Sequence, residues 1–227
     1  AESGAAELCS AILHAVLPAE LAGEIRTAAA KLGARLVVRS SAVDEDGEHA
    51  SWAGQFETVL GARPGDETAY GERRGRPSEV RMAVLIQPMI EPRCAGVMFT
   101  INPLSGSWRE MTVEAAWGQA APVVEGELVP DYYVVRRPRR APRPLGRILA
   151  AVRLEVIEDE VRPQADMWVI GQSGLEVRPV APVDVEAPKL RHFELNRLCR
   201  LGLRVEGLLG RPQDLEWALD DEGRFFV

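Results

Sequence analysis

Four apolar runs crowd into one part of the sequence: MAVLIQPMI (Met82–Ile90), AGVMFTI (Ala95–Ile101), EMTVEAAW (Glu110–Trp117) and DYYVVR (Asp131–Arg136). Each run has the length and apolar character of a strand, and turn residues separate one run from the next. The connections are too short to hold crossover helices. The sequence therefore predicts a mixed or antiparallel sheet in an α+β fold, and it argues against a doubly wound sheet.

Helical and further strand patterns lie on both sides of this region. Apolar residues at three-to-four-residue spacing predict two helices within 5–32, broken at Pro18, and a long helix from Phe193 to about Leu209, which Gly210 and Pro212 end. Three shorter patterns predict strands: RLVVR (Arg35–Arg39), the pair ADMWVI and LEVRPV (165–170 and 175–180), and two strands within DLEWALDDEGRFFV (214–227).

Three polar stretches read as loops. The segment Ser40–Gln55 is small, polar and acidic, and its length makes it a functional candidate. The segment Ala62–Glu79 is rich in Gly, Pro and charge. RRPRRAPRPLGR (Arg136–Arg147) is basic and Pro-rich, which is typical of a solvated linker, with phosphate contact as the alternative.

Composition excludes several classes of protein. Of 227 residues, 46% are hydrophobic and 27% charged, and the net charge is −7, which disfavours nucleic acid and anionic membranes as partners. No apolar run approaches the roughly 18 residues of a membrane helix, and the first residues lack the basic region of a signal peptide. Cys9, Cys94 and Cys199 are scattered without metal-ligand spacing, so we expect a reduced, cytoplasmic protein.

The first chemical motif is LVVRSSA, which begins the polar loop. Arg39 offers a planar fork of donors that matches phosphate oxygens, and Ser40 adds a hydroxyl and a backbone N–H. Further along the loop, Gly54 permits close approach of the backbone to a ligand, and Thr58 adds a hydroxyl. On spacing alone, a strand cap or an ion pair with Asp44 or Glu45 is the favoured explanation of Arg39.

Two more motifs follow at strand ends. The backbone groups of Gln87, Met89 and Ile90 are suited to adenine recognition, with Met89 packing on the ring, although a plain strand end has the same pattern. Asp214 and Glu216 fall on one face of a strand, where a cation between them would relieve their repulsion. Mg²⁺ takes one or two carboxylates together with substrate phosphates, whereas a solvated strand face is the alternative.

Taken in order, the motifs resemble the nucleotide-binding module of the phosphoenolpyruvate synthase family. That family includes pyruvate phosphate dikinase and rifampin phosphotransferase. The segments that carry the resemblance are VRSSAVDEDGEHASWAGQFETVLG, VLIQPMIEPRCAGVMFTINPLSG, VVEGELVPDYYV and GRPQDLEWALDDEG. The resemblance implies an ATP-grasp fold, in which two α+β lobes hold ATP and Mg²⁺. It also implies transfer of the ATP β-phosphate to a histidine on a separate swivelling domain, then to pyruvate or a small-molecule hydroxyl, with release of AMP and phosphate.

The resemblance implies a role for each matching residue. Arg39 matches the phosphate-binding arginine, and Gly54 and Thr58 match the glycine-rich loop. Gln87, Met89 and Ile90 match the adenine hinge, and Asp214 and Glu216 the metal-side acids, with Arg39 and Glu216 as the catalytic pair. The expected division is a partial first subdomain over 1–82 and a second over 83–227.

The sequence also departs from the family pattern. A Gly-Gly-Lys segment, a Gln-x-Arg-Pro motif and a histidine domain have no match, and Ala121 stands where the family has an acid. His14, His49 and His192 lack the setting of a phosphorylated histidine. We therefore expect the phosphohistidine domain and an acceptor-substrate domain elsewhere, in a longer chain or in trans. The alternatives are a nucleotide-binding regulatory module without phosphotransfer and, ranked lowest, an ATP-grasp carboxylate ligase.

Overall fold

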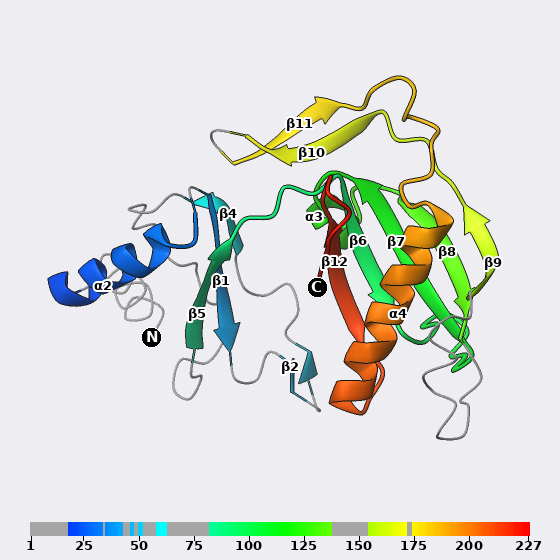
Figure 1. Cartoon of the computed structure of the whole chain (residues 1–227), viewed down its shortest axis with the longest axis horizontal. Helices are drawn as coiled ribbons and strands as arrows, with labels where there is room; N and C mark the ends of the chain where they lie inside the picture. Colours follow the sequence, from blue (N-terminus) through cyan, green and yellow to red (C-terminus); the bar gives the residue numbers. More distant parts are fainter. Residues whose placement is uncertain are drawn as a thin grey trace, which may run out of the picture. The chain divides into compact units, whose positions relative to one another are not determined.

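The computed structural model describes residues 18–33, 35–42, 46–47, 50–51, 58–62, 82–137, 154–171 and 174–227. They belong to two compact units. The first unit comprises Ala1–Met89 and Ile170–Leu175, and the second comprises Ile90–Val169 and Glu176–Val227. Each unit is described by itself, and Figure 1 gives the labels of the elements.

The first unit contains one helix beside a small sheet. Helix α2 (Ala19–Ala30) begins after Pro18, and the sheet has the order β4 (Thr58–Ala62), β1 (Leu36–Ala42), β5 (Met82–Pro88). Both strand pairs are antiparallel. Ala29 of α2 and Leu36 of β1 are buried together, with Val38 and Ile86 packed against them. Two short strands, β2 (Asp46–Gly47) and β3 (Ala50–Ser51), form a separate pair.

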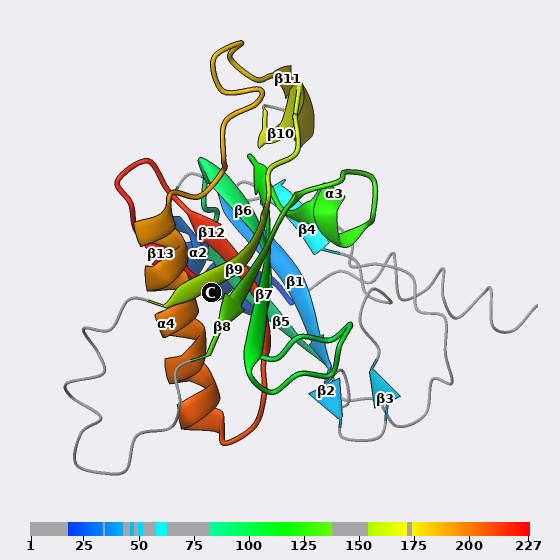
Figure 2. The same cartoon turned by 90° about the vertical axis from the view of Figure 1, so that its right-hand side faces the viewer.

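The second unit is built on a six-stranded antiparallel sheet. Its order is β13 (Phe225–Phe226), β12 (Asp214–Leu219), β6 (Cys94–Phe99), β7 (Glu110–Trp117), β8 (Asp131–Arg136), β9 (Glu155–Glu160). A hairpin of β10 (Asp166–Ile170) and β11 (Leu175–Pro179) follows β9 in the chain. The short helix α3 (Ala121–Val124) and the long helix α4 (His192–Leu209) lie on opposite sides of the sheet (Figure 2).

Alternation along the strands assigns the two faces of this sheet. Met111 and Val113 of β7 are fully buried in the same core as Leu195 and Leu198 of α4. The helix approaches closely because Gly202 has no side chain: a Cβ there would lie 2.3 Å from the Cε atom of Met98. The core-facing residues of the strands therefore pack against α4, and the alternate residues lie on the other face of the sheet.

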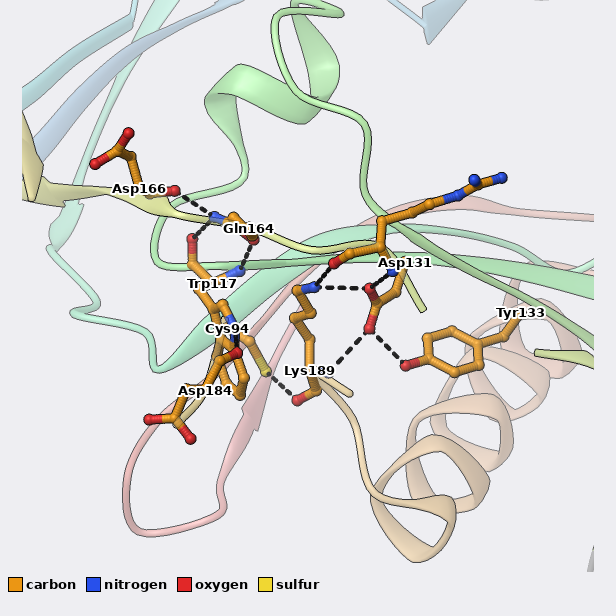
Figure 3. A network of polar contacts seen from close by, with 9 residues as sticks. Cys94, Trp117, Asp131, Tyr133, Gln164, Asp166, Asp184 and Lys189 are labelled. Carbon is orange, nitrogen blue, oxygen red and sulfur yellow. Dashed lines mark hydrogen bonds and ion pairs between the residues drawn. The ribbon is translucent and has the colours of Figure 1, made fainter. Parts of the chain in front are cut away.

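A buried ion pair joins β8 to the segment before α4 (Figure 3). Lys189 Nζ lies 2.8 Å from Asp131 Oδ1, and the two side chains are 1% and 0% exposed. Asp131 also accepts hydrogen bonds from the Tyr133 hydroxyl, at 2.9 Å, and from the backbone N–H groups of Arg162 and Lys189. Lys189 Nζ donates in addition to the Arg162 carbonyl. Both buried charges thus have several polar partners, as a buried ion pair requires.

Most expected elements are present. The helix at 192–209, the hairpin at 166–179 and the strand that starts at Leu36 are confirmed. The expected sheet is antiparallel, but it holds only three of the four expected strands, β6, β7 and β8, because β5 pairs with β1 in the sheet of the first unit. The expected start of a loop at Ser40 is wrong, because β1 continues through Ala42. The sequence reading also missed five elements, namely β2, β3, β4, β9 and α3. Residues 5–17 of the expected N-terminal helix, and the loops at 63–79 and 138–147, lie outside the described residues. The subdomain division between 82 and 83 stays a prediction. Among the described helices, none has the length and apolar character needed to cross a membrane.

Candidate nucleotide site

Two of the expected phosphate-binding residues are strand neighbours in the first unit. In the register of β1 with β4, Arg39 pairs with Thr58, and on its other side Arg39 pairs with Leu85 of β5. Arg39 is exposed. Ser40 follows in β1 and pairs with Val84. Gly54 lies outside the described residues. The strand pairing therefore brings Arg39 and Thr58 together from positions far apart in the sequence.

The expected adenine hinge begins at the end of β5. Gln87 pairs with Val37 of β1, and the next residues leave the sheet. The Met89 N–H donates to the Arg35 carbonyl at 3.0 Å, and the Ile90 carbonyl accepts from Gln119 Nε2 at 3.2 Å. The Met89 N–H is thus occupied within the first unit. The Ile90 carbonyl keeps its second lone pair as an acceptor.

The two expected metal-side acids lie on one exposed strand face of the second unit. Asp214 and Glu216 are two residues apart in β12, and both are exposed, whereas Trp217 and Leu219 point into the core. Partial desolvation raises the pKa of the Asp214 carboxyl group, and the Glu216 carboxylate raises it further. This mutual repulsion is the condition that a bound cation relieves.

Glu114 is a third carboxylate on the same face, and the sequence analysis did not identify it. Asp214 pairs with Phe99, and Phe99 pairs with Thr112, so these three residues share one row across the sheet. Glu114 follows Thr112 by two residues and therefore points the same way. Desolvation raises the pKa of Glu114, and the Asp214 carboxylate adds to that increase. The alternation of polar Thr112 and Glu114 in an apolar strand is the signal that identifies this face.

The carboxylates of Asp214 and Glu216 suit a hard cation that also binds ligands from outside the protein. Within the part of the chain that the structure describes, no three side chains of the metal-ligating types meet as a cluster. Asp214 and Glu216 therefore offer two carboxylates at most as a close pair. Mg²⁺ is commonly held by one or two carboxylates plus substrate phosphates and water, so the pair is compatible with Mg²⁺ only when a phosphate ligand is present.

Two further positions bear on the expected chemistry. His192 is exposed at the start of α4, and Ala121 begins α3. The remaining histidines, His14 and His49, lie outside the described residues. The structure therefore places Ala121, where the sequence departs from the family pattern, at the first position of α3.

Comparison with known proteins identifies the domain type. The family model described as "Pyruvate phosphate dikinase, AMP/ATP-binding domain" matches residues 2–227. Rifampicin phosphotransferase of Streptomyces sviceus is 33% identical over 96% of this chain, and phosphoenolpyruvate synthase of Pyrococcus furiosus is 30% identical over 93%. A prodigiosin-synthesizing transferase, PigC, of Serratia marcescens is 32% identical over 93% of the chain.

The chain spans only part of these relatives. It covers 26% of the length of the rifampicin phosphotransferase, 28% of the phosphoenolpyruvate synthase and 24% of the prodigiosin-synthesizing transferase. The three relatives are named for different compounds, and this chain matches a part of each of them. The match along residues 2–227 shows that the chain belongs to the AMP/ATP-binding domain family of pyruvate phosphate dikinase.

Proposed function

We propose that this chain is an ATP-grasp nucleotide-binding domain that presents Mg·ATP for transfer of the β-phosphate. The observation that carries the proposal is the pair of repelling carboxylates, Asp214 and Glu216, exposed on one strand face of a chain that matches an AMP/ATP-binding family. Two such carboxylates are unfavourable to each other unless a cation neutralises them.

The proposed phosphate-binding groups lie in the first unit. In the first unit, Arg39 supplies a bidentate donor, and the hydroxyl and backbone groups of Ser40, Gly54 and Thr58 supplement it. Strand register supports part of this set because it pairs Arg39 with Thr58. Phosphoryl transfer depends mainly on positioning and on neutralising spread negative charge, which is what an arginine and backbone donors provide.

The hinge from Gln87 to Ile90 is the proposed adenine-binding segment. Because the Met89 N–H donates to Arg35, the groups offered to adenine are the Gln87 side chain, the Ile90 carbonyl and the Met89 side chain. Gln87, Met89 and Ile90 are all partly buried, so a planar ring placed against them would lose water on one face.

Asp214 and Glu216 are the proposed residues that hold Mg²⁺, with ATP phosphates as its other ligands. The ion supplies charge neutralisation at the phosphates when it is bound. In the proposed reaction, a histidine nitrogen on another domain bonds to the β-phosphorus, the bond from that phosphorus to the α-bridging oxygen breaks, and AMP leaves. Water then releases the γ-phosphoryl group as phosphate, and the phosphohistidine passes its phosphoryl group to pyruvate or a small-molecule hydroxyl.

A second candidate is a module that binds nucleotide without phosphotransfer. Ala121 favours it, because the residue that begins α3 offers no charge to a metal or phosphate. The two candidates agree on nucleotide binding and differ in the products. AMP with phosphate supports the first, nucleotide binding without turnover supports the second, and ADP with an acyl phosphate would support a ligase.

The test is a calorimetric titration of Mg·ATP into protein that contains this chain. We expect Arg39→Ala and Glu216→Gln each to weaken binding by about tenfold or more, since a hydrogen bond to a charged group contributes roughly 1.5–3 kcal/mol. The matched controls are Arg26→Ala and Glu158→Gln, which alter exposed charges outside the proposed site. Equal effects of the site and control variants, or no binding by folded protein, would contradict the proposal.

A further inference from the structure

The turn that leads into β12 is attached to the end of β6 by Thr100. The Thr100 N–H donates to the Gln213 carbonyl at 2.9 Å, and the Gln213 N–H donates to Thr100 Oγ1 at 2.8 Å. In a regular antiparallel pair the second bond would go to the Thr100 carbonyl. Here the hydroxyl replaces the carbonyl, and Thr100 is completely buried. The side chain of Thr100 therefore holds the residue that immediately precedes Asp214.

Arg137 donates to the Thr100 carbonyl, which the Gln213 N–H leaves available. Arg137 Nη1 donates to the Thr100 carbonyl at 2.9 Å, and Arg137 Nη2 lies 2.5 Å from Glu206 Oε1 in the last turns of α4. The Arg137 N–H also donates to the Arg109 carbonyl at 2.8 Å. A planar guanidinium can satisfy both acceptors at once, which a lysine ammonium cannot do with the same geometry. The arginine thus fastens the end of β8 to the end of β6 and to α4.

These bonds meet where α4 turns back into β12. Figure 1 shows α4 running beside the sheet and the chain returning into β12 from the end of the helix. The first residue of a strand is the one most prone to fraying when its preceding turn is free. Asp214 is that first residue, and its pairing with Phe99 continues the Thr100–Gln213 attachment by one position.

We propose that Thr100 and Arg137 are positioning residues for the Asp214 carboxylate, and that they fix the metal-side strand for Mg·ATP. The inference rests on the proposed metal role of Asp214 and Glu216. Neither residue touches the nucleotide in this proposal. Thr100 holds the backbone of Gln213, and Arg137 in turn holds the Thr100 carbonyl and Glu206. Residues that orient metal ligands typically change metal affinity by about 10–100-fold when they are removed.

The experiment measures Mn²⁺ binding in the presence of a non-hydrolysable ATP analogue, by electron paramagnetic resonance of free Mn²⁺. It uses protein that contains this chain. Thr100→Val keeps the shape of the side chain and removes the acceptor, so we expect the Mn²⁺ dissociation constant to rise about tenfold. Thr100→Ser restores the hydroxyl and should return the constant to within about twofold of the wild type. Arg137→Met should match Thr100→Val, and Arg137→Lys should recover only part of the loss.

A matched control separates positioning from general destabilisation. Arg93 pairs with Glu194 at 2.9 Å near the other end of α4, so Arg93→Met also breaks a partly buried arginine–glutamate pair. We expect Arg93→Met to lower the urea midpoint while leaving the Mn²⁺ constant unchanged. If Arg93→Met and Thr100→Val weaken Mn²⁺ binding equally, the positioning role is wrong.

Asp214→Asn separates failure of this inference from failure of the proposed function. If Asp214→Asn leaves Mn²⁺ binding unchanged, the metal role of Asp214 is wrong and the positioning role fails with it. If Asp214→Asn weakens binding but Thr100→Val and Arg137→Met do not, only the positioning role is overturned.

Discussion

Gly96 shows how a single absent side chain sets the spacing of two central strands. A Cβ atom at Gly96 would lie 2.0 Å from the Glu114 carbonyl oxygen, which is a backbone atom of β7. The backbone cannot swing aside as a side chain does, so Gly96→Ala must separate β6 from β7. We expect a loss of about 2–3 kcal/mol in the free energy of unfolding, measured by urea denaturation.

The control for this substitution is Gly207→Ala in α4. Nothing lies within 4 Å of a Cβ at Gly207, and the residue is exposed. Alanine should therefore stabilise the helix by about 0.5–1 kcal/mol, because it loses less backbone entropy on folding. Opposite signs for the two glycines are expected, and a neutral Gly96→Ala would show that the strands are not packed as closely as the structure has them.

The buried Lys189–Asp131 pair makes a second prediction at this scale. Lys189→Met removes the cation and leaves a completely buried carboxylate with only the Tyr133 hydroxyl and two backbone N–H groups. Breaking a buried pair from one side costs about 3–5 kcal/mol, and we expect that loss in urea denaturation.

The comparison for that pair is the ion pair of Arg136 with Glu155. Arg136 Nη1 lies 2.7 Å from Glu155 Oε2, but the side chains are 54% and 59% exposed. Exposed pairs contribute about 0–1 kcal/mol, so Arg136→Met should change stability little. Similar losses in Lys189→Met and Arg136→Met would mean that the Lys189 ammonium is hydrated in solution.

Among the elements, α4 carries the clearest pH dependence, at its first turn. Burial alone would raise the pKa of Glu194, but hydrogen bonds from the side chain and backbone of Arg191, with the charges of Arg93 and Arg191, lower it overall. A carboxyl group whose pKa is lowered on folding stabilises the fold above its unfolded pKa. That stabilisation is lost as the pH falls through the lower, folded value.

Glu194→Gln tests this assignment. At pH 7 we expect the variant to be less stable by about 1.5–3 kcal/mol, because a hydrogen-bonded charge is replaced by a neutral amide. The difference from the wild type should shrink as the pH falls below about 4. The measurement is the urea midpoint at several pH values, and a difference that stays constant down to pH 3 would contradict the assignment.

At the element scale, periodicity and turn residues were enough to predict the main strands and α4. The structure confirms the run EMTVEAAW as β7, in which every residue is buried except the half-buried Glu110 and Glu114. The strand β9 was missed because EVIEDE is mostly exposed, so its acidic residues hide the strand period. The helix α3 has only four residues, too few for a helical period to appear.

The candidate site was harder to predict than the elements, for a physical reason. Asp214 and Glu216 could be predicted as neighbours because residues two apart on a strand lie on the same face. Glu114 could not be predicted as their neighbour, because its place beside them depends on the register of β12, β6 and β7, which local sequence does not encode. Thr100 and Arg137 were missed for the same reason, because they meet only through tertiary hydrogen bonds.

On the scale of the whole molecule, the described residues form a separate buried cluster in each unit. Among these residues, the cluster of the first unit contains Ala29 and Leu36, whereas the cluster of the second runs from Cys94 to Leu219. Ligands that bind only the folded state add stability according to their concentration over the dissociation constant. Mg·ATP that binds the folded protein as proposed should therefore raise its stability.

The last prediction concerns the phosphate that is transferred, and it needs protein that carries this chain with its further domains. With ATP labelled at the β-phosphate, we expect the protein to take up an acid-labile, base-stable label, which is the behaviour of a phosphohistidine. Label at the γ-position should appear as phosphate, and label at the α-position as AMP.

Glu216→Gln should lower the rate of uptake by about 100-fold, since removing one group that stabilises transition-state charge costs about 10²–10³ in rate. Glu158→Gln should leave the rate unchanged. Transfer of the γ-label with formation of ADP would exclude the proposed reaction even if Mg·ATP binds. Binding without any uptake would favour a regulatory module, in which the Asp214–Glu216 pair holds the metal but no histidine reaches the β-phosphorus.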